Sequence, residues 1–501
     1  MLSQLIDRRK KSKQILLDIS VLIAGLILPF AYAPYDIWWL SFPLLAWLFL
    51  VCVQQTPGRA FRRGWLFGLG WFVHGVHWVF YSLHYHGGTP SFLAYIIVIL
   101  LAAYLALFPG LAMYLGQKLF KSLRPLLKLV VVFPALWLLS EWLRGWLFTG
   151  FPWLQIGYTQ TDTWLAGYAP LFGGLGISGL LALVSGLLAA WSLQHKRYRL
   201  PLTMLVLWLI GFGLQQVQWT EPNGRSLRVS LLQGNIPQSE KWKFEMHDPT
   251  LALYHRLTMQ QTHADLIIWP ETAVPDFQHR VPFYLNRLKK DMEFRDQHLL
   301  LGIFVREPDA ALYYNSVLNI RGGVYRKRHL VPLGEYFPLR SVLNFFRQWI
   351  RIPMSDIAEG PEDQPLLEVE GIKLGVNICF EDAFDRDVMR DLPEADILVN
   401  VSNDAWFEDS PEAWQHHQIA RMRAMESGRY LLRATNTGVS SVIDPQGIVE
   451  AIAPQFEESV LKAQVQAYQG STPYAVWRNF PLVGGLILLL AVLWFKTRPT
   501  A

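Results

Sequence analysis

Three polar residues stand where a fold could present them for chemistry. Glu271 follows the run Leu266–Trp269, Lys327 lies in a basic stretch, and Cys379 follows the run Ile372–Ile378. A thiol nucleophile needs a base to take its proton, and the oxyanion formed during attack needs positive charge or N–H donors. A carboxylate, an ammonium and a thiol together therefore predict acyl transfer through a covalent thioester.

Each of these residues alone is weak evidence. A cysteine in a strand is usually a small core residue. A glutamate after a strand is more often a solvated loop residue, and a lysine among other basic residues is more often part of a surface patch. Their combination is what predicts a site. The only other cysteine, Cys52, lies in an apolar run, so we expect no disulfide.

The elements that would position these residues lie between residues 221 and 478, where charges are common and apolar runs are short. Runs rich in Val, Ile and Leu predict buried strands at Leu227–Gln233, Leu266–Trp269, Leu299–Phe304, Ser316–Asn319, Ile372–Ile378, Ile397–Val401, Tyr430–Ala434 and Ser440–Ile443. Helical stretches lie between them at Pro249–Thr262, Pro282–Phe294 and Glu412–Ser427. Strands that alternate with helices predict an α/β domain.

The rest of the chain has a membrane-like composition. The chain of 501 residues is 52% hydrophobic and only 17% charged, against roughly 25% charged in ordinary globular proteins. Long apolar runs predict seven spanning helices in residues 1–220 and an eighth in residues 479–501. They are Ile15–Ala33, Ile37–Val53, Trp65–Leu83, Phe92–Leu115, Leu129–Phe148, Leu171–Leu193, Leu200–Val217 and Phe480–Phe495.

The loops between these runs predict their orientation. Lysines and arginines gather at the N-terminus, after the second, fourth and sixth helices and in the C-terminal tail, whereas the alternate loops contain none. Because basic residues favour the cytoplasmic side, both termini are expected there and residues 221–478 on the outside. The first helix could instead be a cleaved signal peptide, but its apolar stretch is longer than such a region usually is and Pro34 follows the candidate cleavage site.

Four segments carry a resemblance to a known family: Gln233–Trp242 (QGNIPQSEKW), Trp269–Thr272 (WPET), Lys327–Glu335 (KRHLVPLGE) and Ser402–Phe407 (SNDAWF). With Glu271, Lys327 and Cys379 in this order, the chain resembles the nitrilase (carbon–nitrogen hydrolase) superfamily. Several membrane helices precede this domain and one follows it. Nearly the whole chain therefore resembles the apolipoprotein N-acyltransferase family of Gram-negative bacteria.

The resemblance implies an α-β-β-α sandwich in the periplasm, attached to a helix bundle of about eight spans in the bacterial inner membrane. Cys379 would be the nucleophile, Glu271 the general base, and Lys327 the cation that stabilises the thiolate and the oxyanion. The implied reaction moves a fatty acyl chain from a membrane phospholipid to the α-amine of a diacylglyceryl-modified N-terminal cysteine on an apolipoprotein. It is the last step of lipoprotein maturation and requires no cofactor, metal or nucleic acid.

Three residues would support this chemistry. The backbone N–H of Phe380, next to the nucleophile, is a candidate second oxyanion donor. Glu335 would orient Lys327 or assist proton transfer, and Glu381 would support the site, although either glutamate could be an ordinary salt-bridge residue.

Aromatic residues are the candidates for lipid binding. Residues 336–354 combine aromatic side chains with arginines, which suits a membrane interface with anionic headgroups. A short amphipathic helix packed on its own domain explains the pattern equally well, and a tryptophan can also be an ordinary core residue. The candidate substrate-binding residues are Trp242, Phe337, Phe345, Phe346 and Trp406.

The sequence leaves two other functions open. In a membrane-anchored amidase or nitrilase, water would replace the lipoprotein amine, and the three site residues do not separate these reactions. The many predicted helices favour acyl transfer, because an anchor needs only one span. In a transporter or scaffold the nitrilase-like domain would be inactive, and the presence of Glu271, Lys327 and Cys379 argues against that.

Overall fold

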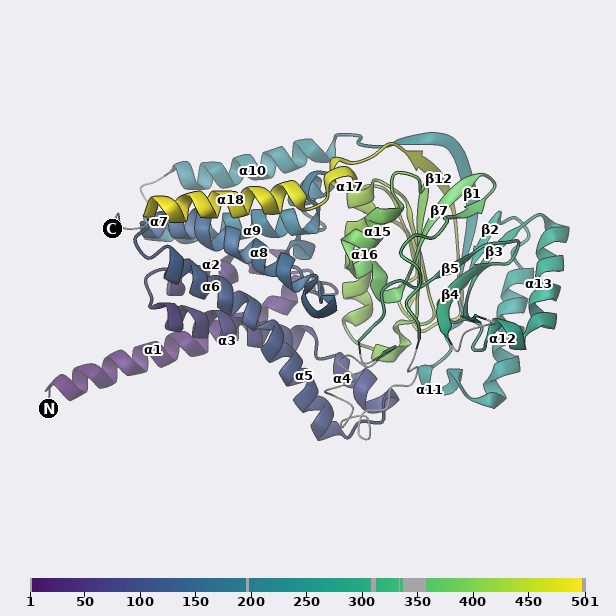
Figure 1. The fold of residues 1–501 in the computed structure, drawn as a ribbon, viewed down its shortest axis with the longest axis horizontal. Coiled ribbons are helices and arrows are strands. Elements are labelled where there is room, and N and C mark those ends of the chain that lie inside the picture. Colours follow the sequence, from purple (N-terminus) through teal and green to yellow (C-terminus); the bar gives the residue numbers. More distant parts are fainter. Residues whose placement is uncertain (1, 195–197, 308–311, 333, 337–356, 498–501) are drawn as a thin grey trace. The chain divides into compact units, whose positions relative to one another are not determined.

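The computed structural model describes residues 2–194, 198–307, 312–332, 334–336 and 357–497. These residues form two compact units. The helical unit comprises residues 1–78, 95–217 and 477–501, and the α/β unit comprises residues 79–94 and 218–476. Figure 1 shows the first as a group of helices and the second as strands covered by helices.

The helical unit is built from apolar segments. Its helices are α1 (Leu2–Ile27), α2 (Ser41–Cys52), α3 (Pro57–Gly75), α5 (Ser91–Leu105), α6 (Leu107–Leu119), α7 (Pro125–Leu127), α8 (Phe133–Arg144), α9 (Ala169–Leu193), α10 (Arg199–Gln215) and α18 (Phe480–Thr497). Val483 of α18 packs against Leu138 of α8 and Leu175 of α9, so the last helix joins the others although some 300 residues separate them in the sequence.

Several of these helices match the membrane-spanning segments expected from the sequence. Among the described residues, five helical segments are long and apolar enough to cross a membrane: Lys11–Ala31, Ser91–Leu119, Pro125–Arg144, Trp164–Leu193 and Phe480–Thr497. Two shorter apolar helices occupy Trp38–Cys52 and Arg199–Gln215. The chain is therefore a membrane protein by its helices, but the predicted count of about eight spans is not confirmed.

The predicted third helix, Trp65–Leu83, differs from the observed one. The structure instead has α3 at Pro57–Gly75, so the helix begins earlier and ends earlier than the apolar run. It begins early because Arg63, which is fully buried, pairs with Asp18 of α1 at 3.0 Å and can lie inside the helical unit. It ends at Gly75, whose carbonyl accepts a hydrogen bond from the indole N–H of Trp78.

The α/β unit contains two six-stranded sheets. The first has the order β12-β1-β2-β3-β4-β5, formed by β12 (Ser459–Gln469), β1 (Glu221–Gln233), β2 (Leu266–Ile268), β3 (His298–Arg306), β4 (Tyr313–Asn319) and β5 (Val324–Arg326). The second has the order β11-β10-β9-β8-β7-β6, formed by β11 (Val449–Ile452), β10 (Ser441–Ile443), β9 (Leu431–Thr435), β8 (Ile397–Ser402), β7 (Ile372–Ile378) and β6 (Leu367–Val369).

The central strands of both sheets are parallel. In the first sheet β1, β2 and β3 pair in parallel, and in the second β7, β8 and β9 do. Parallel strands are covered on both faces, which explains why they read as continuous apolar runs in the sequence. Their carboxyl ends meet at one edge of each sheet, and in open α/β folds ligands bind at that edge.

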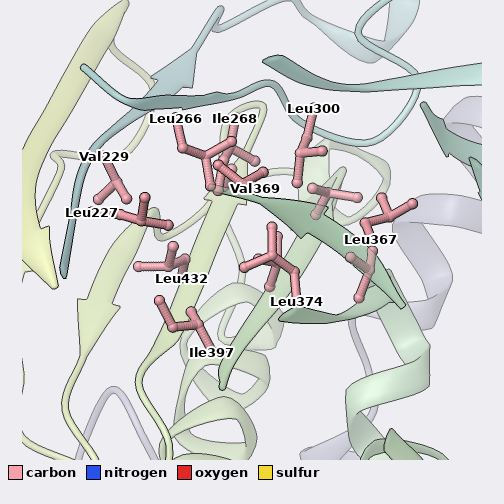
Figure 2. Packing of buried hydrophobic residues seen from close by; sticks show 14 of the residues in the cluster. Leu227, Val229, Leu266, Ile268, Leu300, Leu367, Val369, Leu374, Ile397 and Leu432 are labelled. Carbon is pink, nitrogen blue, oxygen red and sulfur yellow. The ribbon is translucent and has the colours of Figure 1, made fainter. Parts of the chain in front are cut away.

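The two sheets pack face to face over an apolar core (Figure 2). Leu266 and Ile268 of the first sheet face Leu374 and Ile397 of the second, and all four are fully buried. At roughly 25 cal/mol per Å² of buried apolar surface, such a core is the main favourable contribution to folding of the unit. It fixes the register of the strands whose ends carry the candidate site.

Helices cover the outer face of each sheet (Figure 1). The helices α12 (Phe244–Met259) and α13 (Pro282–Arg295) pack on the first sheet through a second apolar cluster. The helix α16 (Glu412–Ser427) and the short α15 (Asp385–Val388) pack on the second through a third. The layer order is helix, sheet, sheet, helix, as the resemblance to the nitrilase superfamily implied.

Candidate active site

Each of the three predicted site residues follows a strand closely. Glu271 comes three residues after β2, Lys327 directly follows β5, and Cys379 directly follows β7. The strands β2 and β5 belong to the first sheet and β7 to the second, so the two packed sheets bring distant parts of the sequence together. Glu271 and Lys327 are almost fully buried, whereas Cys379 is partly exposed.

The ammonium of Lys327 lies between two carboxylates. Lys327 Nζ donates a hydrogen bond to Glu335 Oε1 at 2.8 Å and lies 3.6 Å from Glu271 Oε1. Glu335 is held in turn by the backbone N–H of Val331, which donates to its other oxygen at 2.8 Å. Lys327 therefore contacts Glu335 directly, and its ammonium also lies near Glu271.

An amide connects the two carboxylates. Asn315 of β4 donates from Nδ2 to Glu271 Oε1 at 2.7 Å and to Glu335 Oε1 at 3.2 Å. The backbone N–H of Lys327 also donates to the carbonyl of Asn315, so the two residues are fixed to each other. Asn315 is fully buried and was not predicted from the sequence.

The pKa values of Lys327 and Cys379 are both raised, but for different reasons. Burial opposes the charge of Lys327, but Glu335 and Glu271 outweigh it and raise the pKa of the ammonium above its ordinary value. Burial and the carboxylate of Glu271 raise the pKa of the Cys379 thiol, and Lys327 lowers it. Both shifts favour the proton-bearing forms, which are the ammonium of Lys327 and the thiol of Cys379.

Cys379 occupies a strained backbone position. Its φ of +53° lies in the left-handed region, which costs a residue with a side chain roughly 1–3 kcal/mol. The carbonyl of Cys379 accepts hydrogen bonds from Asn400 Nδ2 and His416 Nε2, each at 3.2 Å. The sharp turn begins a short 3₁₀ helix, Cys379–Ala383, and places the predicted donor Phe380 in its first turn.

Glu381 is fully buried and links the turn at Cys379 to the residues that follow Lys327. Its Oε2 accepts the backbone N–H of Ile378 at 2.6 Å and the hydroxyl of Tyr325 at 2.9 Å. Its Oε1 accepts the backbone N–H groups of Arg328 at 2.6 Å and His329 at 3.0 Å. Burial raises the pKa of Glu381 to about 7, although the backbone donors act to lower it. Glu381 therefore connects the residues next to Cys379 with those next to Lys327.

A second buried network lies behind the nucleophile, and sequence reasoning missed it. His416 of α16 contacts Asp382 through Nε2 at 2.7 Å and Asp404 through Nδ1 at 3.2 Å. Arg433 of β9 contacts the same two carboxylates at 3.2 and 3.1 Å. Burial and Arg433 oppose the charge of His416, but the carboxylates prevail and raise its pKa to about 10. The network supports the carbonyl of Cys379 with a charged imidazolium.

The same network contains the one group among the described residues whose ligand atoms could surround a metal ion. One ligand atom each of Asp404, Glu412 and His416 lies within 4.8 Å of the others. Both nitrogens of His416 already face carboxylates, and Arg433 supplies positive charge to Asp404. This donor set fits a salt-bridge network better than a divalent cation, which needs a neutral imidazole.

The predicted substrate-binding residues are only partly described. Trp242 is 41% exposed, and its ring stacks on that of Phe304 at 5.9 Å. Trp406 is partly buried, with its ring 5.6 Å from that of His86. Phe337, Phe345 and Phe346 lie outside the described residues.

Comparison with known proteins covers both units. The family model described as the apolipoprotein N-acyltransferase N-terminal domain matches residues 24–187, and the carbon–nitrogen hydrolase model matches residues 228–474. Among solved structures, a carbon–nitrogen hydrolase from Helicobacter pylori is 16% identical, with a TM-score of 0.35 over 55% of this chain and 95% of that one.

Curated relatives extend over nearly the full length. The apolipoprotein N-acyltransferase of Methylococcus capsulatus is 45% identical over 96% of this chain and 96% of its own. That of Nitrosomonas europaea is 42% identical over 93% of this chain and 95% of its own, and that of Vibrio cholerae is 38% identical over 94% and 95%. With the carbon–nitrogen hydrolase domain and the apolar helices in one chain, these matches identify it as a member of the apolipoprotein N-acyltransferase family.

Proposed function

We propose that this chain transfers a fatty acyl group from a membrane phospholipid to the α-amine of a diacylglyceryl-modified N-terminal cysteine on an apolipoprotein. The transfer proceeds in two half-reactions through a thioester on Cys379 and completes lipoprotein maturation. The observation that carries the proposal is the Lys327 ammonium, buried between Glu271 and Glu335. Its charge lowers the pKa of the Cys379 thiol, which is partly exposed.

In the first half-reaction the Cys379 sulfur attacks the ester carbonyl of the phospholipid while Glu271 takes the thiol proton. Lys327 and the backbone N–H of Phe380 stabilise the oxyanion of the tetrahedral intermediate. The intermediate collapses by breaking the ester C–O bond, and the leaving oxygen takes the proton back from Glu271. The products are a lysophospholipid and an acyl thioester on Cys379.

In the second half-reaction the neutral α-amine of the lipoprotein cysteine attacks the thioester carbonyl. Glu271 takes a proton from the attacking nitrogen, and Lys327 again stabilises the oxyanion. Collapse breaks the C–S bond and releases an amide, while the sulfur regains its proton from Glu271. The enzyme returns to its starting state, so the scheme balances without a metal or a cofactor.

Attachment to a membrane suits lipid substrates, because each CH₂ group drawn from the bilayer into water costs about 0.8 kcal/mol. We place the chain in the bacterial inner membrane, with residues 1–220 and 479–501 as the spanning part and residues 221–478 as a periplasmic catalytic domain. Beyond the five membrane-length segments, α2, α3 and α10 would complete eight spans and put both termini in the cytoplasm. The basic loops on alternate sides of the helices support this orientation.

Trp242 is the best-supported contact for the acyl chain. It directly follows the short helix α11 (Gln238–Lys241), and its half-exposed ring stacks on Phe304. Phe304 in turn lies against the rings of Phe277 and Tyr313, at 5.8 Å from each. An apolar chain could lie along this aromatic surface, whereas Trp406 contacts another part of the unit.

The test is the dependence of acyl release on the acceptor. The purified chain in mixed micelles is given acyl-labelled phospholipid, first alone and then with a synthetic diacylglyceryl lipopeptide carrying a free α-amine. We expect one equivalent of lysophospholipid per enzyme without acceptor, and turnover with transfer of label to the peptide when it is present. Steady release of free fatty acid without acceptor would favour a hydrolase, and a Cys379→Ala variant that still acylates the peptide would contradict the proposed nucleophile.

A further inference from the structure

A second lysine reaches the candidate site and is not among the predicted catalytic residues. Lys241 ends α11 and is only 2% exposed. Its Nζ donates a hydrogen bond of 3.2 Å to the main-chain carbonyl of Glu271. The neighbouring Lys243 is very different, because its side chain is 53% exposed and pairs with Glu240 on the surface.

A main-chain hydrogen bond alone does not account for a buried ammonium. Any N–H donor could hold the carbonyl of Glu271, and a buried charge carries a large desolvation cost unless other charges compensate it. Burial lowers the pKa of Lys241 to about 8, while Glu271 and Cys379 act in the opposite direction and stabilise the charge. The charge of Lys241 therefore interacts with the reacting groups themselves.

Lys241, Glu271, Lys327 and Glu335 form one contiguous set of buried groups, and its charges balance only when Lys241 is included. Glu271 and Glu335 are negative and Lys327 is positive, and all three are almost fully buried. Without Lys241 this group would carry one uncompensated negative charge. When the Cys379 proton moves to Glu271 the total does not change, and the new thiolate or oxyanion replaces the carboxylate. With Lys241 these four residues and Cys379 together stay neutral at every step of the reaction.

We propose that Lys241 is the second cation of the catalytic centre, a positioning residue that holds the main chain of Glu271 and stabilises the thiolate and oxyanion of Cys379 by its charge. The inference rests on the proposed nucleophilic role of Cys379. It assigns Lys327 and Lys241 different tasks. Lys327 contacts both carboxylates, whereas Lys241 neutralises the excess negative charge that they leave.

The experiment measures the rate of iodoacetamide alkylation at Cys379 at pH 7, followed by peptide mass spectrometry, on the full chain in detergent. Lys241, with a pKa of about 8, carries its charge at this pH. Removing this positive charge disfavours the thiolate, so Lys241→Met should slow alkylation by about tenfold or more. The first half-reaction should slow by at least about tenfold. Lys241→Arg and the surface control Lys243→Met should both alkylate at nearly the wild-type rate.

Two further variants separate charge from structure. Lys241→Gln keeps an N–H donor without the charge, and it should slow alkylation at pH 7 as Lys241→Met does. In Lys241→Met combined with Glu335→Gln one negative charge is also removed, so the logarithm of the alkylation rate should return at least halfway to the wild-type value. A wild-type alkylation rate in Lys241→Gln, or no return in the double variant, would overturn the inference. Alkylation requires no acyl transfer, so these outcomes do not depend on whether wild-type Cys379 forms a thioester.

Discussion

The side-chain amide of Asn315 donates a hydrogen bond of 2.7 Å to Glu271, the carboxylate proposed as the general base. The same nitrogen reaches Glu335 at 3.2 Å, so one amide holds two carboxylates on either side of the Lys327 ammonium. Such a bridge limits how far Glu271 can rotate away from the thiol. The geometry of the base therefore depends on a neutral residue in the middle of a strand.

Replacing Asn315 with alanine should misplace Glu271 without removing any charge. Because a displacement of about 1 Å can cost roughly 10²-fold in rate, we expect thioester formation to slow by about 10- to 100-fold. The rate of thioester formation is measured as the rate of lysophospholipid release in a single turnover. Asn319→Ala is the matched control, since Asn319 lies on the same strand but donates to the backbone of Glu368. Equal rates for both variants would contradict the proposed role of the bridge.

Replacing Lys327 with methionine should affect both rate and stability. The loss of a transition-state cation should slow thioester formation by at least about 10²-fold. The two carboxylates left buried should cost about 3–5 kcal/mol in the free energy of unfolding. Adding Glu335→Gln should recover part of the stability but little of the rate, as measured by thermal unfolding and single-turnover assays. Recovery of both would mean that Lys327 is only a structural residue.

Glu381→Gln should weaken the connection between the turn at Cys379 and the loop at Lys327. An amide cannot accept at both ends, so at least one backbone N–H among its four partners loses its acceptor. We expect a loss of about 1–3 kcal/mol in the free energy of unfolding, together with slower thioester formation. Glu368→Gln, an exposed change on β6, should alter neither quantity. A fully stable but inactive Glu381→Gln variant would instead indicate a direct chemical role.

The buried imidazolium of His416 predicts a pH dependence of stability. The pKa of His416 is raised from about 6.5 in the unfolded chain to about 10 in the folded one, so its contribution is complete below pH 6.5 and is lost as the pH rises through 10. The loss amounts to about 1.4 kcal/mol per pH unit within that window. Between pH 7 and 10.5, the unfolding temperature should fall more steeply with pH in the wild type than in His416→Asn. The exposed control His263→Asn should follow the wild type. If the unfolding temperature of His416→Asn fell as steeply as that of the wild type, a charged His416 in the folded chain would be excluded.

The predictable part of the site consists of residues with a local signal. Glu271 and Cys379 stand out because a polar side chain follows an apolar run, and Lys327 because it begins a segment, Lys327–Glu335, that resembles a known family. Asn315 has no such signal, since it sits within a strand and its partners lie 20 and 44 residues away. His416 likewise reads as an ordinary helix residue. Its role becomes visible only when α16 packs against the sheet that carries Cys379.

The fold, like the site, was predictable only where the sequence carries a local signal. The buried parallel strands were predicted because they are continuous apolar runs, whereas β12 was missed. In β12 the apolar Ala463, Val465 and Ala467 alternate with polar residues, which is the pattern of an edge strand with one exposed face. A search for apolar runs overlooks that alternation. The start of α3 was missed because a hydropathy pattern does not show that Arg63 is buried on Asp18.

The central claim is a covalent acyl group on the sulfur of Cys379. Incubating the full chain with acyl-labelled phospholipid, without acceptor, and mapping the label by peptide mass spectrometry tests it directly. We predict one acyl group on the peptide containing Cys379, removed by neutral hydroxylamine and by the lipopeptide amine. Glu271→Gln should lack the label. A label that resists hydroxylamine, that lies on another residue, or that forms equally well in Cys379→Ala would contradict the account.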